Sequence, residues 1–175
     1  MIRYLAANGL EVIELADTAI SHMLRYRQAR SSAKEAGGQL FASFSSGLVR
    51  VERASGPSLF DRRSRFSFLP SNRNAAKVIR DFHRRGLHYV GDWHTHPEAR
   101  PSPSADDLRS IHSAYRESVH HLSGFLMVIV GTEPPPHGLF AALADGHDIH
   151  PLRPLTELIG NAGARNEEPD DAGSR

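Results

Sequence analysis

Short apolar stretches, most of them alternating with polar residues, recur along the chain and predict β-strands. They cover residues 10–15, 39–44, 48–53, 65–69, 87–93, 124–130 and 139–144. The stretches 39–44 and 48–53 flank Ser45, Ser46 and Gly47, which is typical of a hairpin with a glycine in its turn. Residues 124–130 are continuously apolar and therefore predict a strand that is buried on both faces.

Apolar residues at helical spacing lie between these strands. They predict helices over about residues 17–30, 71–86, 104–115 and 154–160. Asp17, Ser71 and Ser104 are candidate N-caps, and Gly86 is a candidate stop. Strands and helices mixed in this order, with one hairpin, predict an α/β fold in which helices flank a mixed central sheet in an α/β/α arrangement.

The length of 175 residues is that of one domain. Residues 1–160 contain every predicted element, whereas residues 161–175 lack large apolar side chains and are expected to form a disordered tail. The sequence contains no apolar run of about 18 to 20 residues, the length that spans a bilayer. Its start does not match a secretory signal, so a cytoplasmic location is expected.

The amino-acid composition limits the kinds of functional site that the chain can form. The chain contains no cysteine, which excludes disulfides, iron–sulfur clusters and cysteine nucleophiles, and its 11 histidines are many for this length. A transition metal would therefore have to bind to His, Asp or Glu. The net charge of +1 indicates neither a nucleic-acid nor a membrane partner, and we expect neither.

A cluster of metal-ligating residue types follows the strand predicted at 87–93. His94 and His96 are two positions apart on an extended chain, so their side chains point to the same side. Pro97 ends the strand, which suggests that the pair lies at an open edge or mouth of the sheet. Asp107, one turn inside the next predicted helix, supplies a third ligand, and three protein ligands with one open position are typical of catalytic zinc.

Each part of this motif also has a simpler interpretation. Ser104 and Asp107 match the Ser-x-x-acid pattern of a helix cap, and a histidine pair on its own is weak support for a metal. The interpretations are compatible, because a capped helix start is a rigid place to hold a ligand. Asp106 would point to another side of the helix, and Trp93 faces away from both histidines and is expected in the core.

The string His94-Thr-His96-Pro97, six residues, then Ser104-Ala-Asp-Asp107 resembles the signature of the JAMM metallopeptidases, also called the JAB/MPN/Mov34 family. The resemblance covers about residues 10–145 and is greatest to short prokaryotic JAB-domain proteins. The stretch from Gly56 to Phe66 also resembles members associated with bacterial anti-phage CBASS operons, which act as ubiquitin-like deconjugating peptidases.

The resemblance implies a role for each residue. One zinc ion would be held by His94, His96 and Asp107, Glu35 would transfer the proton, and Ser104 would donate a hydrogen bond to the developing oxyanion. Glu35 matches the family context because small residues, including Gly37 and Gly38, follow it and would let a substrate approach. Three other glutamates lack such a small pair: Glu11, Glu14 and Glu52.

The implied function is that of a zinc isopeptidase or peptidase that cleaves after the C-terminal tail of a ubiquitin-like modifier, with a role in anti-phage defence. The tail would add as a strand at the sheet edge beside the site. The implied partners are the modifier or its conjugate, E1/E2-like conjugating enzymes and a nucleotidyltransferase target. The arginine clusters at 62–65 and 84–85 are expected to be solvated, with an acidic protein surface as a second interpretation.

Three alternatives stay open at this point. The chain could be a non-catalytic MPN scaffold, although it retains every expected ligand. It could be a RadC-like JAB protein that acts with DNA, although Thr95 stands where those proteins usually have Asn. About 30 residues before Glu35 also leave little room for their helix-hairpin-helix module. It could finally hydrolyse a small-molecule amide or trim a sulfur-carrier precursor.

Overall fold

The computed structural model describes residues 1–6, 11–65 and 67–156. A curled, mixed sheet of eight strands forms its centre, in the order β1-β2-β4-β3-β7-β8-β9-β10. These strands are β1 (Ile2–Leu5), β2 (Val12–Leu15), β3 (Gly37–Ser45), β4 (Leu48–Ala54), β7 (His88–Thr95), β8 (Phe125–Val130), β9 (Leu139–Ala144) and β10 (Ile149–Pro151). A separate ribbon pairs β5 (Arg62–Arg63) with β6 (Phe68–Leu69).

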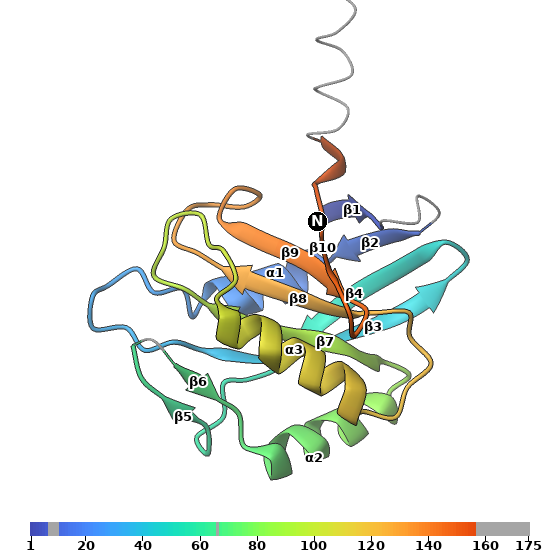
Figure 1. Cartoon of the computed structure of the whole chain (residues 1–175), viewed down its shortest axis with the longest axis horizontal. Coiled ribbons are helices and arrows are strands. Elements are labelled where there is room, and N and C mark those ends of the chain that lie inside the picture. Colours follow the sequence, from blue (N-terminus) through green and yellow to red (C-terminus); the bar gives the residue numbers. More distant parts are fainter. Residues whose placement is uncertain (7–10, 66, 157–175) are drawn as a thin grey trace, which may run out of the picture.

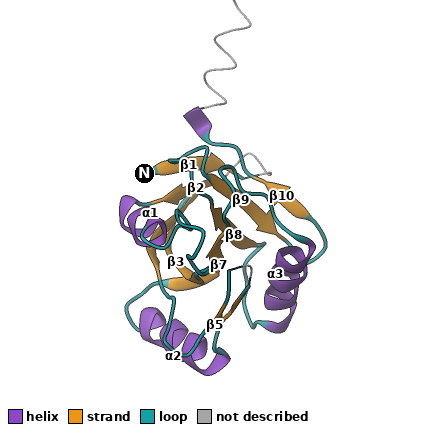
Figure 2. Cartoon of the chain, turned by 90° about the vertical axis from the view of Figure 1, so that its left-hand side faces the viewer, coloured by secondary structure: helices purple, strands orange, loops and turns teal. Residues whose placement is uncertain are grey.

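Three helices cover the two faces of the sheet: α1 (Asp17–Leu24), α2 (Asn72–His83) and α3 (Ala105–Glu117). Figure 2 shows α1 and α3 on opposite sides of the curled sheet, with α2 below. The α/β/α arrangement predicted from the sequence is therefore confirmed. None of the helices in the described residues is both long and apolar enough to cross a bilayer.

The pairing of the strands explains the shape of the sheet. The predicted hairpin is β3 with β4, and β7 pairs antiparallel with β3 and parallel with β8 (Figure 1). At the two ends of the strand order, β1 approaches the residues after β10 through an antiparallel bridge between Tyr4 and Pro154. The sheet therefore curls until its first strand meets the segment that follows its last strand.

Some predicted boundaries were wrong. The helix that begins at Asp17 ends at Leu24 instead of continuing to about Arg30. A continued helix would place Arg27 and Arg30 on the face of Ile20 and Met23, and these charged residues would give it no further apolar face. The strand expected at 65–69 is reduced to the two residues of β6. The short strands β1 and β10 were not predicted, since three or four residues carry too little periodicity.

Two further predictions concern the C-terminal segment. The segment expected to form a disordered tail, residues 161–175, lies outside the described residues, as does most of the helix expected at 154–160.

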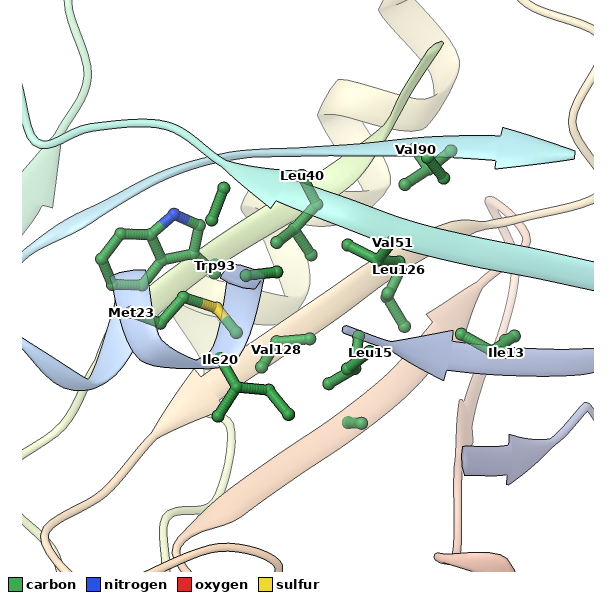
Figure 3. Packing of buried hydrophobic residues seen from close by; sticks show 14 of the residues in the cluster. Ile13, Leu15, Ile20, Met23, Leu40, Val51, Val90, Trp93, Leu126 and Val128 are labelled. Atoms are coloured by element: carbon green, nitrogen blue, oxygen red, sulfur yellow. The ribbon is translucent and has the colours of Figure 1, made fainter. Parts of the chain in front are cut away.

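The larger hydrophobic cluster lies between α1 and one face of the sheet. Ile20 and Met23 of α1 pack against sheet residues that include Trp93 and Val128 (Figure 3). Trp93 is 1% exposed, as expected for a core residue, and its indole N–H donates to the Ser55 carbonyl at 2.8 Å. This cluster holds the strands that lead to the site.

The opposite face carries a second cluster beneath α2 and α3. Ile111 of α3 packs against strand residues such as Phe125 and Met127. Phe82 of α2 stacks on Phe41, with ring centroids 4.1 Å apart. Because side chains alternate along a strand, His94, next to Trp93, lies on this second face.

A buried carboxylate joins the three strands at one end of the sheet. Glu14 of β2 is fully buried and lies directly opposite Arg3 of β1 and Arg50 of β4. Arg3 Nε donates to one carboxylate oxygen at 2.7 Å, and Arg50 Nη1 lies 2.9 Å from the other. The two half-exposed arginine side chains therefore cover the charge that they neutralise.

Replacing Glu14 with glutamine is expected to lower the free energy of unfolding by about 1 to 3 kcal/mol, because the two arginines stay charged and lose the buried negative charge that compensates them. Urea denaturation would measure the loss. The matched control is Lys77→Gln, which removes the exposed ion pair with Asp81 and should change stability by less than about 0.5 kcal/mol. Equal stability of Glu14→Gln and the unmodified protein would show that these contacts contribute nothing net.

Candidate metal centre

The two histidines lie at the carboxyl end of β7. Of the two places expected for this pair, an open edge of the sheet is wrong, because β7 is a central strand between β3 and β8, whereas His94 does line a groove that opens beside the sheet. The pairing continues past its end, where the His96 N–H donates to the Val130 carbonyl at 2.9 Å. Both imidazoles are therefore carried by a strand that is held on two sides.

Asp107 reaches the histidines from the first turn of α3. Ser104 is the N-cap of this helix and forms a capping box with Asp107, so the predicted cap is confirmed. The Ser104 hydroxyl donates to Asp107 Oδ2 at 2.6 Å, and the Ser104 N–H donates to the same oxygen at 2.7 Å. These bonds fix the carboxylate beside the end of β7.

The ligand atoms have the spacing of a tetrahedral metal site. His94 Nε2 lies 3.1 Å from His96 Nε2 and 3.1 Å from Asp107 Oδ1, and His96 Nε2 lies 3.4 Å from Asp107 Oδ2. Donor atoms bound at about 2.0–2.1 Å to a tetrahedral zinc ion lie about 3.3–3.4 Å from one another. Two imidazole nitrogens and one carboxylate, whose Oδ1 lies near His94 and whose Oδ2 lies near His96, therefore suit zinc, which accepts both types of donor.

Glu35 completes the cluster. Its carboxylate and the imidazoles of His94 and His96 each offer a ligand atom within 4.8 Å of the others. Glu35 is 7% exposed, and burial raises the pKa of its carboxyl group, although the two histidines act in the opposite direction. A carboxylate with a raised pKa beside a metal site is well suited to accept and return a proton.

Asp107 is held in its ionised form. Burial raises the pKa of this carboxyl group, but hydrogen bonds from His94, His96 and Ser104 outweigh that effect and hold the pKa well below its usual range. The two carboxylates of the site therefore differ in character: Asp107 stays a carboxylate, as a metal ligand must, while Glu35 holds a proton more readily.

The glycines after Glu35 are required by packing within the protein. A Cβ on Gly37 would lie 2.6 Å from both the Trp93 carbonyl and the Phe68 ring, and a Cβ on Gly38 would lie 2.0 Å from the Ser55 carbonyl. Gly38 also lines the groove beside Glu35, so the expected room for a substrate stays a prediction.

The other acidic candidates lie away from this cluster. Glu14 is in the ion pairs of β1 and β4, Glu52 accepts from the Ser43 hydroxyl at 2.6 Å, and Glu11 lines a pocket on the face that carries α1. Asp106 is exposed and pairs with Arg109, as its place on the helix predicted. Of the acidic residues weighed in the sequence, the structure brings Glu35 and Asp107 to the histidines.

A groove of about 410 Å³ opens from the cluster between α2 and α3. Tyr89, Asp92 and His94 of β7 lie along it, and Phe68 and Leu69 of β6 line it from the ribbon. Tyr89 donates its hydroxyl to Asp92 at 3.0 Å, and burial raises the pKa of the Asp92 carboxyl group to about 6. Asp92 was not among the residues expected in the site, although it shares the period-two face of the histidines.

Comparison with known proteins identifies the family. The family described as prokaryotic homologs of the JAB domain matches residues 18–142, and the chain belongs to it. The matched range includes Glu35, both histidines, Ser104 and Asp107. The resemblance to short prokaryotic JAB proteins is thereby confirmed.

Curated relatives share one name, CD-NTase/cGAS isopeptidase. The protein from Enterobacter hormaechei is 27% identical over 160 residues, which are 90% of this chain and 88% of the relative. The Pseudomonas aeruginosa protein is 30% identical over 110 residues (61% and 70%), and the Vibrio cholerae protein is 33% identical over 115 residues (64% and 71%).

A solved structure supports the fold. The solution structure of a protein from Desulfitobacterium hafniense covers 79% of this chain and 88% of its own, with a TM-score of 0.58 and 23% identity. This similarity concerns the arrangement of sheet and helices alone.

Proposed function

We propose that this protein is a zinc-dependent isopeptidase that cleaves the amide bond between a protein's C-terminal tail and an amine. One observation carries the proposal: three ligand atoms with tetrahedral spacing lie beside the buried Glu35, at the mouth of a groove. The isopeptidase names of the relatives support the reaction class.

His94, His96 and Asp107 would hold the zinc ion. When bound, zinc polarises the carbonyl of the amide bond and makes water more acidic. The chain itself fixes the ligands, since both imidazoles come from one central strand and the carboxylate is held by the Ser104 capping box.

Glu35 moves the proton. Its carboxylate takes a proton from the attacking water and returns that proton to the nitrogen of the leaving amine, which departs in its neutral form. Burial favours this exchange because the raised pKa lets the same group hold the proton between the two transfers.

The substrate would lie in the groove between α2 and α3 as an extended segment, since about 410 Å³ is too small for a folded domain. β7 itself is paired on both sides, so the expected strand addition near the site would use the edge of the β5–β6 ribbon, whose Phe68 and Leu69 line the groove. The relatives' names favour a CD-NTase as one of the joined proteins. We propose that the substrate is a conjugate of a CD-NTase, in which the cleaved bond follows the C-terminal tail of a ubiquitin-like modifier or a similar C-terminal tail. Its E1/E2-like conjugating enzymes would be functional partners in anti-phage defence.

The test uses two reporters with the same C-terminal tail. In one the tail is joined to a lysine side chain of a fluorescent peptide, and in the other it continues as an ordinary peptide bond. We expect release from the lysine-linked reporter, loss of release with a chelator, and recovery on adding zinc. Release that survives complete metal removal, or no release from either reporter, would overturn the proposal.

Ser104 is proposed to donate to the developing oxyanion. Its hydroxyl proton is donated to Asp107 Oδ2 in this structure, so donation to the oxyanion would replace that bond, whereas the helix cap uses the hydroxyl oxygen as an acceptor from the Asp107 N–H. Replacing Ser104 with alanine should cost about 1 kcal/mol of stability as a lost cap. It should also lower kcat by about 10² to 10³ with little change in KM, measured by steady-state kinetics.

The variant Ser104→Asp separates the two roles. Aspartate caps a helix but has no hydroxyl to donate, so stability should recover while kcat stays low. Full activity of Ser104→Asp would show that Ser104 only caps the helix and does not donate to the oxyanion. Melting temperature and turnover on both variants decide between these results.

A further inference from the structure

The loop that carries Glu35 is bound on one flank to the strand that carries the metal ligands. The Ala36 N–H donates to Thr95 Oγ1 at 3.0 Å, and the Thr95 N–H donates to the Ala36 carbonyl at 2.8 Å. Thr95, which stands between the two histidines in the sequence, is fully buried. One end of the loop is thus aligned with β7.

The other flank is held by the ribbon. The Glu35 N–H donates to the Ser64 carbonyl at 2.7 Å. Arg63 Nε donates to the Glu35 carbonyl at 2.7 Å, and Arg63 Nη2 donates to the Lys34 carbonyl at 3.3 Å. One guanidinium therefore spans two successive backbone carbonyls, which its planar fork of donors allows.

A buried amide connects the two flanks. The Gln28 side chain is 4% exposed; it accepts from Thr95 Oγ1 at 3.3 Å and donates to the Arg65 carbonyl at 2.8 Å. The same amide donates to the Ala33 carbonyl at 3.2 Å. The loop, β7 and the segment around Arg63 are therefore parts of one hydrogen-bonded network.

The Glu35 carboxylate itself accepts no hydrogen bond from the residues that the structure describes, so its position depends on how the backbone is held. We propose that Arg63 is a positioning residue for Glu35: by binding the carbonyls of Lys34 and Glu35 it sets the carboxylate against the metal centre. This inference rests on the proposed function of Glu35. It also links the ribbon, whose Phe68 and Leu69 line the groove, to the group that transfers the proton.

Three variants test the proposal: Arg63→Ala, Arg63→Lys and the control Arg62→Ala. Arg62 is the exposed neighbour on β5 and does not line the groove. Small displacements of a reacting group cost up to about 100-fold in rate. We expect kcat of Arg63→Ala to fall about 10- to 100-fold with KM within about threefold and bound zinc unchanged. Lysine offers one donor site in place of the fork and should restore part of kcat, while Arg62→Ala should match the unmodified protein.

A second readout is independent of activity. Hydrogen exchange of the Glu35 amide, which donates to Ser64, should be faster in Arg63→Ala and unchanged in Arg62→Ala. Unchanged exchange and unchanged kcat in Arg63→Ala would overturn the inference, as would an equal loss in Arg62→Ala. If the unmodified protein cleaves neither reporter, the proposed function is wrong. Hydrogen exchange of the Glu35 amide then decides by itself whether Arg63 holds the loop. If Arg63→Ala does not fold, the comparison of Arg63→Lys with Arg62→Ala decides by the same two measurements.

Discussion

Replacing Glu35 with glutamine is expected to lower turnover by about two to four orders of magnitude while the protein keeps its fold and its zinc. The physical reason is that glutamine has nearly the same shape but cannot accept the proton of the attacking water. Glu35 is not one of the three proposed ligands, so the metal should stay bound. Single-turnover kinetics on the lysine-linked reporter, with elemental analysis of the same sample, measures both quantities.

The matched control for this result is Glu52→Gln. Glu52 also bonds within the sheet, to the Ser43 hydroxyl, but it lies away from the metal centre, and its variant should turn over normally. If Glu35→Gln cleaves the reporter at the rate of the unmodified protein, Glu35 does not transfer the proton. Loss of zinc in Glu35→Gln would instead make Glu35 a ligand.

Replacing His94 with alanine is expected to remove most of the bound zinc and, with it, all measurable cleavage. Two protein ligands instead of three remain, one from His96 and one from Asp107, whereas catalytic zinc sites have three. Elemental analysis should find one zinc per chain in the unmodified protein. Zinc should also raise the melting temperature of the unmodified protein, since ligand binding to the native state stabilises it by about 4 kcal/mol at 1,000 times Kd.

His147→Ala serves as the control, because His147 is an exposed histidine in the turn between β9 and β10. It should retain zinc, activity and the zinc-dependent rise in melting temperature. Freshly purified, unchelated protein without any transition metal would overturn the zinc assignment. So would a His94→Ala variant with a full complement of zinc.

The part of the site that could be predicted from sequence is the part that depends on local geometry. His94 and His96 share a side because a strand has a period of two, and Asp107 is fixed by a cap three residues before it. Glu35 is 59 positions before His94, and its place depends on the pairing of Gly37 with His94 across β3 and β7. No local pattern contains that pairing, which is why Glu35 was found through resemblance.

Arg63 was missed for a related reason. Its partners are backbone carbonyls, which every residue has, so the contact leaves no pattern of side chains in the sequence. The arginine cluster at 62–65 was therefore expected to be solvated. The wrong expectation of an open sheet edge at the end of β7 has the same origin, because which strands flank β7 is decided by pairings between distant segments.

The bridge between Tyr4 and Pro154 has a consequence for aggregation. Strands at the edge of a sheet present unpaired N–H and carbonyl groups that can pair with another molecule. In this fold β1 occupies one such edge and is itself partly covered by the segment after β10. A truncation that removed Ile2–Leu5 would therefore expose β2 as a new edge and favour self-association of the protein, without changing any of the proposed metal ligands.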